Sequence, residues 1–321
     1  MKAVVRARYG PPDVLELREV ERPILTADRV LVRVRASSVN RGDWYELIGR
    51  PYVARPSFGL VRPKSQLLGT DFAGVVEAVG DDVHDLQPGD EVFGLRGGAF
   101  AEYVSVRDGV ALKPASLSFE EAAAVPVAAL TALQGLREHG GLAPGQKVLI
   151  NGASGGVGTF AIQIAKALGA DVTAVCSTRN VDQARMLGAE RIVDYGSEDF
   201  TRSGGAYDVL LDIAGGRSWS ELKRVLSPEG TLVIIGAQAG SGLLGPLGHV
   251  LAVRLTALRD PRNVRFFIAK PNRPDLASLR ELIEEGKVRP VVERRYELSE
   301  IADALRQMGE GHVQGKLVVT V

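Results

Sequence analysis

A glycine-rich turn that follows an apolar run is the clearest candidate for ligand chemistry in this sequence. The segment Lys147–Gly158 reads KVLINGASGGVG. Glycines let the backbone approach a pyrophosphate, and the free N–H groups and dipole of the following helix stabilise its charge. The spacing departs from strict G-x-G-x-x-G, so a tight turn without a ligand and an S-adenosylmethionine site remain alternatives. The residues expected to bind a dinucleotide here are Gly152, Ser154, Gly155, Gly156 and Val157.

The end of the next apolar run indicates which dinucleotide binds. An NAD site usually places Asp or Glu about 20 residues beyond the turn, on the ribose 2′-hydroxyl. Here Cys176 and Ser177 fall at that position, and Arg179 follows. No acid stands there to repel a phosphate, Arg179 can form charge-assisted bonds with one, and Ser177 adds a hydroxyl donor. The sequence therefore predicts NADP(H) rather than NAD(H), with a solvated loop charge as the alternative for Arg179.

These turns need a parallel sheet to position them. Strands that are apolar throughout and alternate with helices indicate a parallel sheet that is covered on both faces. Ligands bind at the carboxyl ends of the strands in such sheets. The expected strands are Lys147–Asn151, Val172–Cys176, Arg191–Asp194, Asp208–Asp212, Thr231–Ile235 and Arg265–Lys270, and the expected helices are Gly156–Leu168 and Val181–Leu187.

The first third of the chain predicts a different architecture. Short alternating segments such as Arg29–Ala36, separated by turns rich in Gly, Pro and Asp, are typical of a small barrel or sandwich. Arg50–Lys64 holds three prolines without a period, and we interpret it as a long loop. Ser118–Glu121 fits a capping box that opens a helix. Later elements are expected as helices at Val127–Glu138, Leu276–Glu285 and Ser299–Met308 and a strand at Lys316–Val321.

Composition narrows the function classes. The 321 residues carry 39 Lys and Arg against 39 Asp and Glu, which argues against a protein that mainly binds nucleic acid. The single cysteine, Cys176, excludes an intramolecular disulfide and a cysteine-rich zinc lobe. The 37 glycines exceed the usual share of about 7%. At about 150 residues per domain, two domains are expected. No apolar stretch of about 20 residues is present, and Met1–Gly10 lacks a signal-peptide core, so a cytoplasmic location without membrane binding is expected.

The order and spacing of several segments resembles the zinc-independent medium-chain dehydrogenase/reductases, in their quinone oxidoreductase branch, along the whole chain. The matching segments are Ser38–Asp43, Gly69–Val76, Pro88–Gly94, Ala128–Leu136, Asn151–Gly158, Val193–Tyr195 and Gly311–Val319. The resemblance implies an α/β protein with a GroES-like β-barrel catalytic domain at 1–121, a Rossmann doubly wound parallel-sheet domain at 122–270, and a C-terminal return to the first domain at 271–321. It implies NADPH-dependent reduction of a small-molecule quinone or enone. It also implies a homodimer in which the edge strand Arg265–Lys270 pairs with its twin.

Departures from the wider family predict chemistry without a metal. Zinc-dependent relatives place Cys where Asn40 stands and Gly-His-Glu where Gly69-Thr70-Asp71 stand. Without thiolate or imidazole there, a tetrahedral zinc has no nitrogen or sulfur ligands. The four histidines, His84, His139, His249 and His312, lack ligand spacing. Hydride addition to a quinone or enone gives an anion that hydrogen-bond donors stabilise, whereas an alcohol needs a base or metal to remove its proton.

The resemblance also assigns roles to single residues. It places Asn40 beside the nicotinamide and the substrate carbonyl as an oxyanion donor. Asp43 shares this motif, where an acid more often orders the loop, and Tyr45 and Tyr52 flank the pocket. It implies further cofactor contacts of three kinds. The Thr131 hydroxyl faces the cofactor, and Tyr195 and Lys316 contact its phosphates. The small residues Ala214, Gly236 and Ala237 leave room for it at the strand ends, and the backbone of Phe267 and Ala269 binds the nicotinamide carboxamide. The plainer alternatives are a turn residue for Asn40, a self-bonded helix hydroxyl for Thr131, packing for the tyrosines and a solvated charge for Lys316.

Two other functions stay open from the sequence. One is an alkenal or alkenoyl-thioester reductase on the same scaffold, which differs in the pocket width set by residues 40–64. The other is a non-catalytic NADPH-binding protein, like the crystallin-type relatives.

Overall fold

The computed structural model describes residues 1–236, 246–258 and 260–321, and these form two compact units. The first unit comprises Met1–Leu130, Lys270–Gly286 and Pro290–Val321, and the second comprises Thr131–Ala269 and Lys287–Arg289. The division falls inside helix α4 (Pro126–Gln134). The domain boundaries expected from the sequence, at 121/122 and 270/271, remain predictions.

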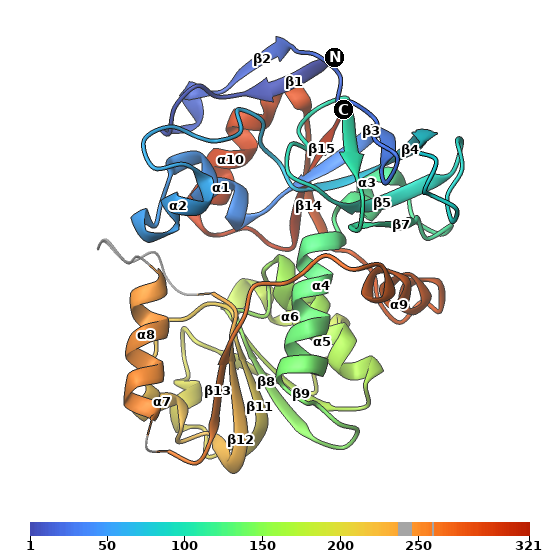
Figure 1. Ribbon diagram of the computed structural model, residues 1–321. Coiled ribbons are helices and arrows are strands. Elements are labelled where there is room, and N and C mark those ends of the chain that lie inside the picture. Colours follow the sequence, from blue (N-terminus) through green and yellow to red (C-terminus); the bar gives the residue numbers. More distant parts are fainter. Residues whose placement is uncertain (237–245, 259) are drawn as a thin grey trace. The chain divides into compact units, whose positions relative to one another are not determined.

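A six-stranded parallel sheet forms the centre of the second unit, in the order β10-β9-β8-β11-β12-β13 (Figure 1). Its strands are β8 (Lys147–Asn151), β9 (Asp171–Cys176), β10 (Arg191–Asp194), β11 (Tyr207–Asp212), β12 (Leu226–Ile234) and β13 (Asn263–Phe266). In chain order this is 3-2-1-4-5-6, the doubly wound arrangement whose strand order reverses between β8 and β11. The predicted parallel sheet is confirmed.

Helices cover this sheet, which explains why its strands are apolar throughout. Helix α5 (Gly156–Ala167) packs on β8 and β9, and α6 (Val181–Met186) packs on β9 and β10. One apolar cluster joins Leu149, Leu210 and Leu232 of the sheet to α7 (Trp219–Leu222) and α8 (Pro246–Ala257). Short helical turns in this unit are a π-helix, η3 (Gly135–His139), and the 3-10 turns η4 (Thr178–Asn180) and η5 (Phe200–Arg202).

Strand β3 (Val30–Val39) is the centre of the first unit. It pairs antiparallel with β4 (Asp71–Val79), β6 (Tyr103–Val106) and the C-terminal β15 (Lys316–Thr320). Leu317 stands opposite Val39, and Asp71 stands opposite Ser38. This register brings the start of β15, the start of β4 and the end of β3 to one place. The other strands are β5 (Glu91–Leu95), β7 (Val110–Leu112), β14 (Val292–Glu297) and the separate pair β1 (Lys2–Val5) and β2 (Glu16–Glu19).

The helices of the first unit include one that the sequence reading missed. The helical elements of the first unit are α1 (Arg41–Ile48), α2 (Arg55–Phe58), α3 (Phe119–Ala123), α9 (Arg273–Glu284), α10 (Ile301–Glu310) and the 3-10 turns η1 (Pro12–Val14), η2 (Tyr52–Ala54) and η6 (Leu298–Glu300). The missed helix is α1, whose signal is an Asn cap followed three residues later by Asp. The capping box of Ser118 and Glu121 is confirmed at α3. None of the described helices is long and apolar enough to cross a membrane.

Two predicted segments differ in the structure. The expected loop Arg50–Lys64 contains η2 and α2, because Pro51 and Pro56 stand where a helical turn accepts proline, at or next to its start. The expected strand Arg265–Lys270 is instead Asn263–Phe266. It ends there because its partner β12 ends at Ile234, which pairs with Phe266, so later residues have no ladder to join.

Candidate functional site

The glycine-rich turn connects β8 to α5 as predicted. Gly152 has a φ of +90°, a conformation that L side chains rarely adopt. A Cβ at Gly158 would lie 2.2 Å from the carbonyl oxygen of Gly152, so the close approach of helix and turn requires glycine there. Both glycines are therefore explained by the fold itself.

Gly155 is different, because its surroundings do not require glycine. A Cβ there would meet only the Gly152 carbonyl oxygen, at 3.8 Å, and its φ is −78°. Within the described residues, the backbone N–H groups of Gly156, Val157 and Gly158 have no hydrogen-bond acceptor. Unpaired N–H groups at the start of a helix, beside a backbone stripped of side chains, fit an anionic pyrophosphate.

The strand-order reversal holds a polar pair that the sequence reading missed. The Nδ2 of Asn151, at the end of β8, donates to Oδ1 of Asp212, at the end of β11, over 2.7 Å. The same oxygen accepts the Gly215 N–H, and Oδ2 has no partner among the described residues. Burial raises the pKa of the Asp212 carboxyl. The pair fixes the loop that carries Ala214, and its signal is a polar residue at the end of each of two apolar strands.

The end of β9 carries the residues predicted to select the dinucleotide. Ser177 is half-buried and its Oγ accepts a bond from Asn180, while Arg179 is exposed in η4. Tyr195 directly follows β10 and is 60% exposed. Cys176 is buried, and burial raises the pKa of its thiol to about 11, consistent with a packing role.

The sheet corrects the expectation that no acid stands at this corner. Asp194 pairs in register with Cys176 on the neighbouring strand. Its carboxylate accepts bonds from the Thr178 hydroxyl at 2.6 Å and from the Gly196 N–H at 2.9 Å. The Thr178 bond is the main reason that the pKa of Asp194 lies below its usual value. The strand next to Cys176 therefore carries a negative charge at this corner, although the end of β9 itself does not.

The remaining predicted cofactor contacts of the second unit are dispersed along it. Phe267 stacks on His139, with ring centroids 4.0 Å apart. A Cβ at Gly236 would lie 2.4 Å from the Ile213 carbonyl oxygen, so this glycine is required by its own loop. Thr131 is half-buried on α4, Ala214 is exposed and Ala269 is half-buried. Ala237 lies outside the described residues.

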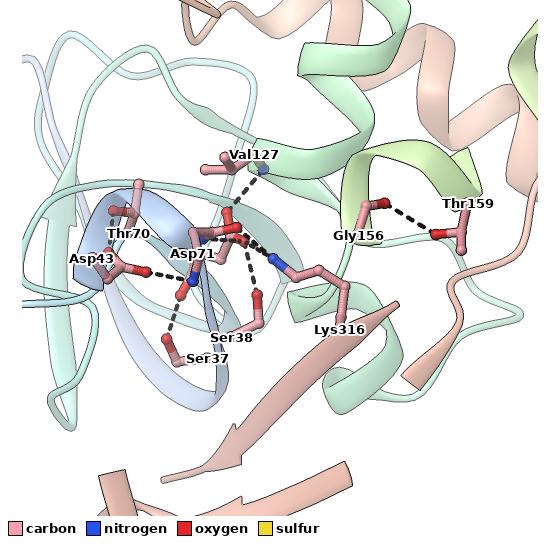
Figure 2. A network of polar contacts seen from close by, with 10 residues as sticks. Ser37, Ser38, Asp43, Thr70, Asp71, Val127, Gly156, Thr159 and Lys316 are labelled. Carbon is pink, nitrogen blue, oxygen red and sulfur yellow. Dashed lines mark hydrogen bonds and ion pairs between the residues drawn. The ribbon is translucent and has the colours of Figure 1, made fainter. Parts of the chain in front are cut away.

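In the first unit, Asp71 is the centre of a buried polar network (Figure 2). Its Oδ2 accepts bonds from Ser38 Oγ at 2.8 Å and Asn40 Nδ2 at 2.9 Å, and lies 3.1 Å from Lys316 Nζ. Its Oδ1 accepts the Val127 N–H at 2.9 Å. The carboxylate is fully buried. From the sequence Asp71 is only the residue that replaces Glu of the zinc-dependent relatives, and the structure shows that it is the residue on which the network converges.

Lys316 is not a solvated charge. It is 2% exposed, and its Nζ also donates to the amide oxygen of Asn40 over 2.5 Å. The predicted contact with a cofactor phosphate would have to compete with Asp71, which already neutralises the ammonium. The alternative of a surface lysine is wrong, because the antiparallel register of β15 carries the side chain into the unit.

Asp43 belongs to the same cluster as a structural acid. Its two carboxylate oxygens accept the Asn40 N–H at 2.7 Å and the Thr70 hydroxyl at 2.8 Å. Burial raises the pKa of Asp43 to about 7, with a smaller contribution from the charge of Asp71. Asn40 caps α1, as its turn-residue alternative supposed, and its side chain also joins the network. Asp43 therefore fixes the start of α1 and with it the position of Asn40.

Tyr45 and Tyr52 make no hydrogen bond to this network within the described residues. Tyr45 is half-buried with the Arg41 guanidinium 6.0 Å from its ring centroid. Tyr52 is 41% exposed, and the guanidinium carbons of Arg50 and Arg55 lie 5.5 Å and 4.6 Å from its ring centroid. The structure thus brings together Asn40, Asp43 and Lys316 of the predicted residues of the first unit.

Comparisons with known proteins agree with both units. The family model "Alcohol dehydrogenase GroES-like domain" matches residues 26–115, and "Zinc-binding dehydrogenase" matches residues 187–319. The mouse mitochondrial NAD(P)H oxidoreductase RTN4IP1 is 35% identical over the whole chain and 89% of its own length. The chloroplastic quinone-oxidoreductase QR1 of Triphysaria versicolor is 32% identical, covering 99% and 98% of the two chains. The 2-methylene-furan-3-one reductase of Solanum lycopersicum is 34% identical, covering 99% and 79%.

Solved structures give the same result. The quinone oxidoreductase from Coxiella burnetii superposes with a TM-score of 0.89 at 33% identity, covering 100% and 99% of the two chains. The CurK enoyl reductase gives 0.87 at 28% identity, covering 99% and 98%. The Escherichia coli quinone oxidoreductase, solved in complex with NADPH, gives 0.84 at 26% identity over both chains.

Proposed function

The chain belongs to the medium-chain dehydrogenase/reductase superfamily and is an oxidoreductase, and from this premise we propose that it reduces a quinone or an α,β-unsaturated carbonyl with NADPH and without a metal ion. The observation that carries the proposal is the buried network of Asn40, Asp71 and Lys316. Asn40 and Asp71 stand at positions where the zinc-dependent relatives differ, and together with Lys316 they offer an amide donor held by an ion pair.

The residues of the second unit fit a dinucleotide. The open space at Gly155 and the N–H groups of Gly156 and Val157, which have no acceptor in the described part of the chain, suit its pyrophosphate. When bound, NADPH supplies the hydride. The preference for NADPH over NADH is supported by Arg179, which can pair with a 2′-phosphate. Asp194 opposes this preference, but its carboxylate is already engaged by Thr178 and Gly196.

Asn40 suits an acceptor that develops negative charge on oxygen. Its Nδ2 carries two hydrogens, of which Asp71 accepts one. The second can donate to a quinone or enone oxygen as the acceptor is reduced, and such donors stabilise the charge most when they are held in advance. Alcohol oxidation would need a base. Asp43, the nearby acid with a pKa of about 7, is buried and bonded to Asn40 and Thr70 instead.

The atoms that could bind a metal at this place also support chemistry without zinc. The oxygens of Asn40 and Asp71 already surround the ammonium of Lys316. A zinc ion at the same oxygens would lie beside a positive charge and would lack the thiolate and imidazole ligands that zinc prefers. Among the described residues, no group of three His, Cys, Asp or Glu side chains could hold a metal.

A turnover screen tests the function. NADPH and NADH are titrated by fluorescence, and 9,10-phenanthrenequinone and trans-2-hexenal are then added while NADPH oxidation is followed at 340 nm. We expect tighter binding of NADPH and turnover with at least one acceptor. Tight binding without oxidation by any acceptor would favour the non-catalytic alternative. Turnover of the enal and not the quinone would favour the alkenal reductase. Stoichiometric zinc whose removal by a chelator abolishes activity would refute the metal-free proposal.

We also propose a homodimer and a cytoplasmic location. Strand β13 ends the parallel sheet, and its outer side pairs with no described strand. Leu251 and Leu255 on the adjacent α8 are 48% and 65% exposed. An unpaired edge beside exposed leucines suits pairing with a second copy. Light scattering after size exclusion gives the mass, and a monomer would contradict the proposal.

Some relatives bear mitochondrial or chloroplastic names, so fractionation of the source cells is the test of the proposed location.

A further inference from the structure

Lys316 is a buried cation with two polar partners among the described residues. Its ammonium contacts Asp71 Oδ2 at 3.1 Å (Figure 2). It also donates to Asn40 Oδ1 over 2.5 Å. Burying a charge is costly unless it is paired and hydrogen-bonded. Asp71 supplies the opposite charge and is itself held by Ser38 and the Val127 N–H. The ion pair is thus built into the junction of β3, β4 and β15.

The two ions fix the orientation of the Asn40 amide. An ammonium can only donate, so the amide presents its oxygen to Lys316. A carboxylate can only accept, so the amide presents its nitrogen to Asp71. The reverse orientation would place Nδ2 against Nζ and oxygen against oxygen. One hydrogen of Nδ2 is used by Asp71, and no described residue accepts the other.

We propose that Lys316 is a positioning residue for the reaction and acts through Asn40, holding the amide so that its second Nδ2 hydrogen faces the acceptor oxygen. The proposal rests on the proposed function. The bond from the ammonium also draws electron density toward the amide oxygen, which makes the N–H a stronger donor.

The step that this donor assists is balanced as follows. The C4–H bond of bound NADPH would break, leaving NADP⁺, and its hydride would form a new C–H bond at the electron-poor carbon of the enone, which is thereby reduced by two electrons. The π pair of the enone C=C bond moves to form the new double bond of the enolate. The π pair of the carbonyl becomes a lone pair on its oxygen. Asn40 donates a hydrogen bond to that oxygen and loses no proton. Water then supplies the proton that completes the reduced product.

The competing explanation is that Lys316 contacts a cofactor phosphate. In that case its loss weakens NADPH binding and leaves the chemistry of the bound complex largely intact. In our proposal its loss lowers kcat and leaves the affinity for NADPH unchanged. The two explanations therefore separate in measurements on the same variants.

The main variant of the test leaves no unpaired buried charge, and its reference variant, which keeps Lys316 without the Asp71 carboxylate, is compared with it only if both fold. The double variant Lys316→Met/Asp71→Asn removes both charges, and Asp71→Asn alone keeps the lysine and an acceptor oxygen for Asn40. Asn40→Ala removes the donor, with and without the double change. Each protein is checked by thermal melting, its Kd for NADPH is measured by fluorescence, and kcat is measured with the acceptor that the wild type prefers.

We expect the double variant to lose about 10- to 100-fold in kcat relative to Asp71→Asn, less than the roughly 100- to 1000-fold cost of removing an oxyanion donor because Asn40 itself remains, with a Kd for NADPH within about twofold. In the Asn40→Ala background, the same double change should lower kcat no further, because the two residues act as one unit. A raised Kd with kcat retained, or independent effects of the two residues, would overturn the inference alone. If none of the acceptors supports NADPH oxidation by the wild-type protein, the proposed function is wrong, and this inference is wrong with it.

Discussion

The ammonium nitrogen of Lys316 lies 2.5 Å from the amide oxygen of Asn40, although 276 positions separate the two residues in the chain. Strand pairing brings them together, because Leu317 of β15 stands opposite Val39 of β3. Asp71 joins them from β4, where it stands opposite Ser38. Three strands thus supply one charge-balanced cluster, and its stability and chemistry can be tested separately.

The first prediction concerns the buried ion pair. Lys316→Met leaves the Asp71 carboxylate buried without its cation, so we expect the free energy of unfolding to fall by about 3 kcal/mol or more. Lys316→Met/Asp71→Asn leaves no unpaired charge and should be more stable than the single variant. Urea denaturation at pH 7 measures both. A double variant less stable than Lys316→Met would contradict the charge explanation.

The second prediction concerns pH. Because the pKa of Asp43 is raised to about 7, the folded protein retains a proton that the unfolded chain loses near pH 4. The contribution of this residue to stability therefore falls as pH rises from about 4 to 7. Asp43→Asn keeps an acceptor for the Asn40 N–H and does not titrate. We expect it to reduce this loss of stability between pH 5 and pH 8, as measured by urea denaturation.

The control for this pH effect is Asp182→Asn, which removes a carboxylate that is 87% exposed on α6. It should leave the pH dependence of unfolding close to that of the wild type. If Asp43→Asn follows the wild-type pH dependence as closely as Asp182→Asn does, Asp43 is ionised in the folded protein at low pH and the prediction is wrong.

The third prediction separates two glycines of one turn. Gly158→Ala places a Cβ 2.2 Å from the Gly152 carbonyl oxygen, and we expect a loss of roughly 1–3 kcal/mol in stability. Gly155→Ala meets no close atom and should leave the melting temperature near that of the wild type. It should nevertheless weaken NADPH binding, because the new methyl group occupies space open to a ligand. Unchanged affinity in Gly155→Ala would place the pyrophosphate elsewhere.

The fourth prediction concerns cofactor choice. Arg179→Ala should weaken NADPH binding about tenfold or more, on the scale of a lost bond to a charged group, and leave NADH binding unchanged. Arg185→Ala is the matched control, because Arg185 is an exposed arginine on the following helix, paired with Asp182. Fluorescence titration with both nucleotides measures the effects. Equal losses for NADPH and NADH in Arg179→Ala would exclude a 2′-phosphate contact.

Local signals in the sequence predicted the second unit well. Strand β8 and the start of α5 follow the predicted bounds, because an apolar run, a glycine turn and a helix start are encoded within a dozen residues. The exposed strand β14 was missed because its consecutive Glu293, Arg294 and Arg295 show no apolar alternation. Helix α8 was also missed, and it is apolar without a clear polar face.

The sequence by itself determined the parallel sheet, the glycine turn and the residue types of the candidate site, because periodicity, caps and turns act over short distances. Only the tertiary structure decided which of those residues meet. It placed Asp194 beside Cys176 through strand order, and it placed Lys316 and Asp71 around Asn40 through antiparallel register. Register depends on packing between segments far apart in the chain, and a sequence pattern within one segment carries no record of its partner. For that reason a lysine that could equally be a surface charge from sequence is the buried cation of the candidate site.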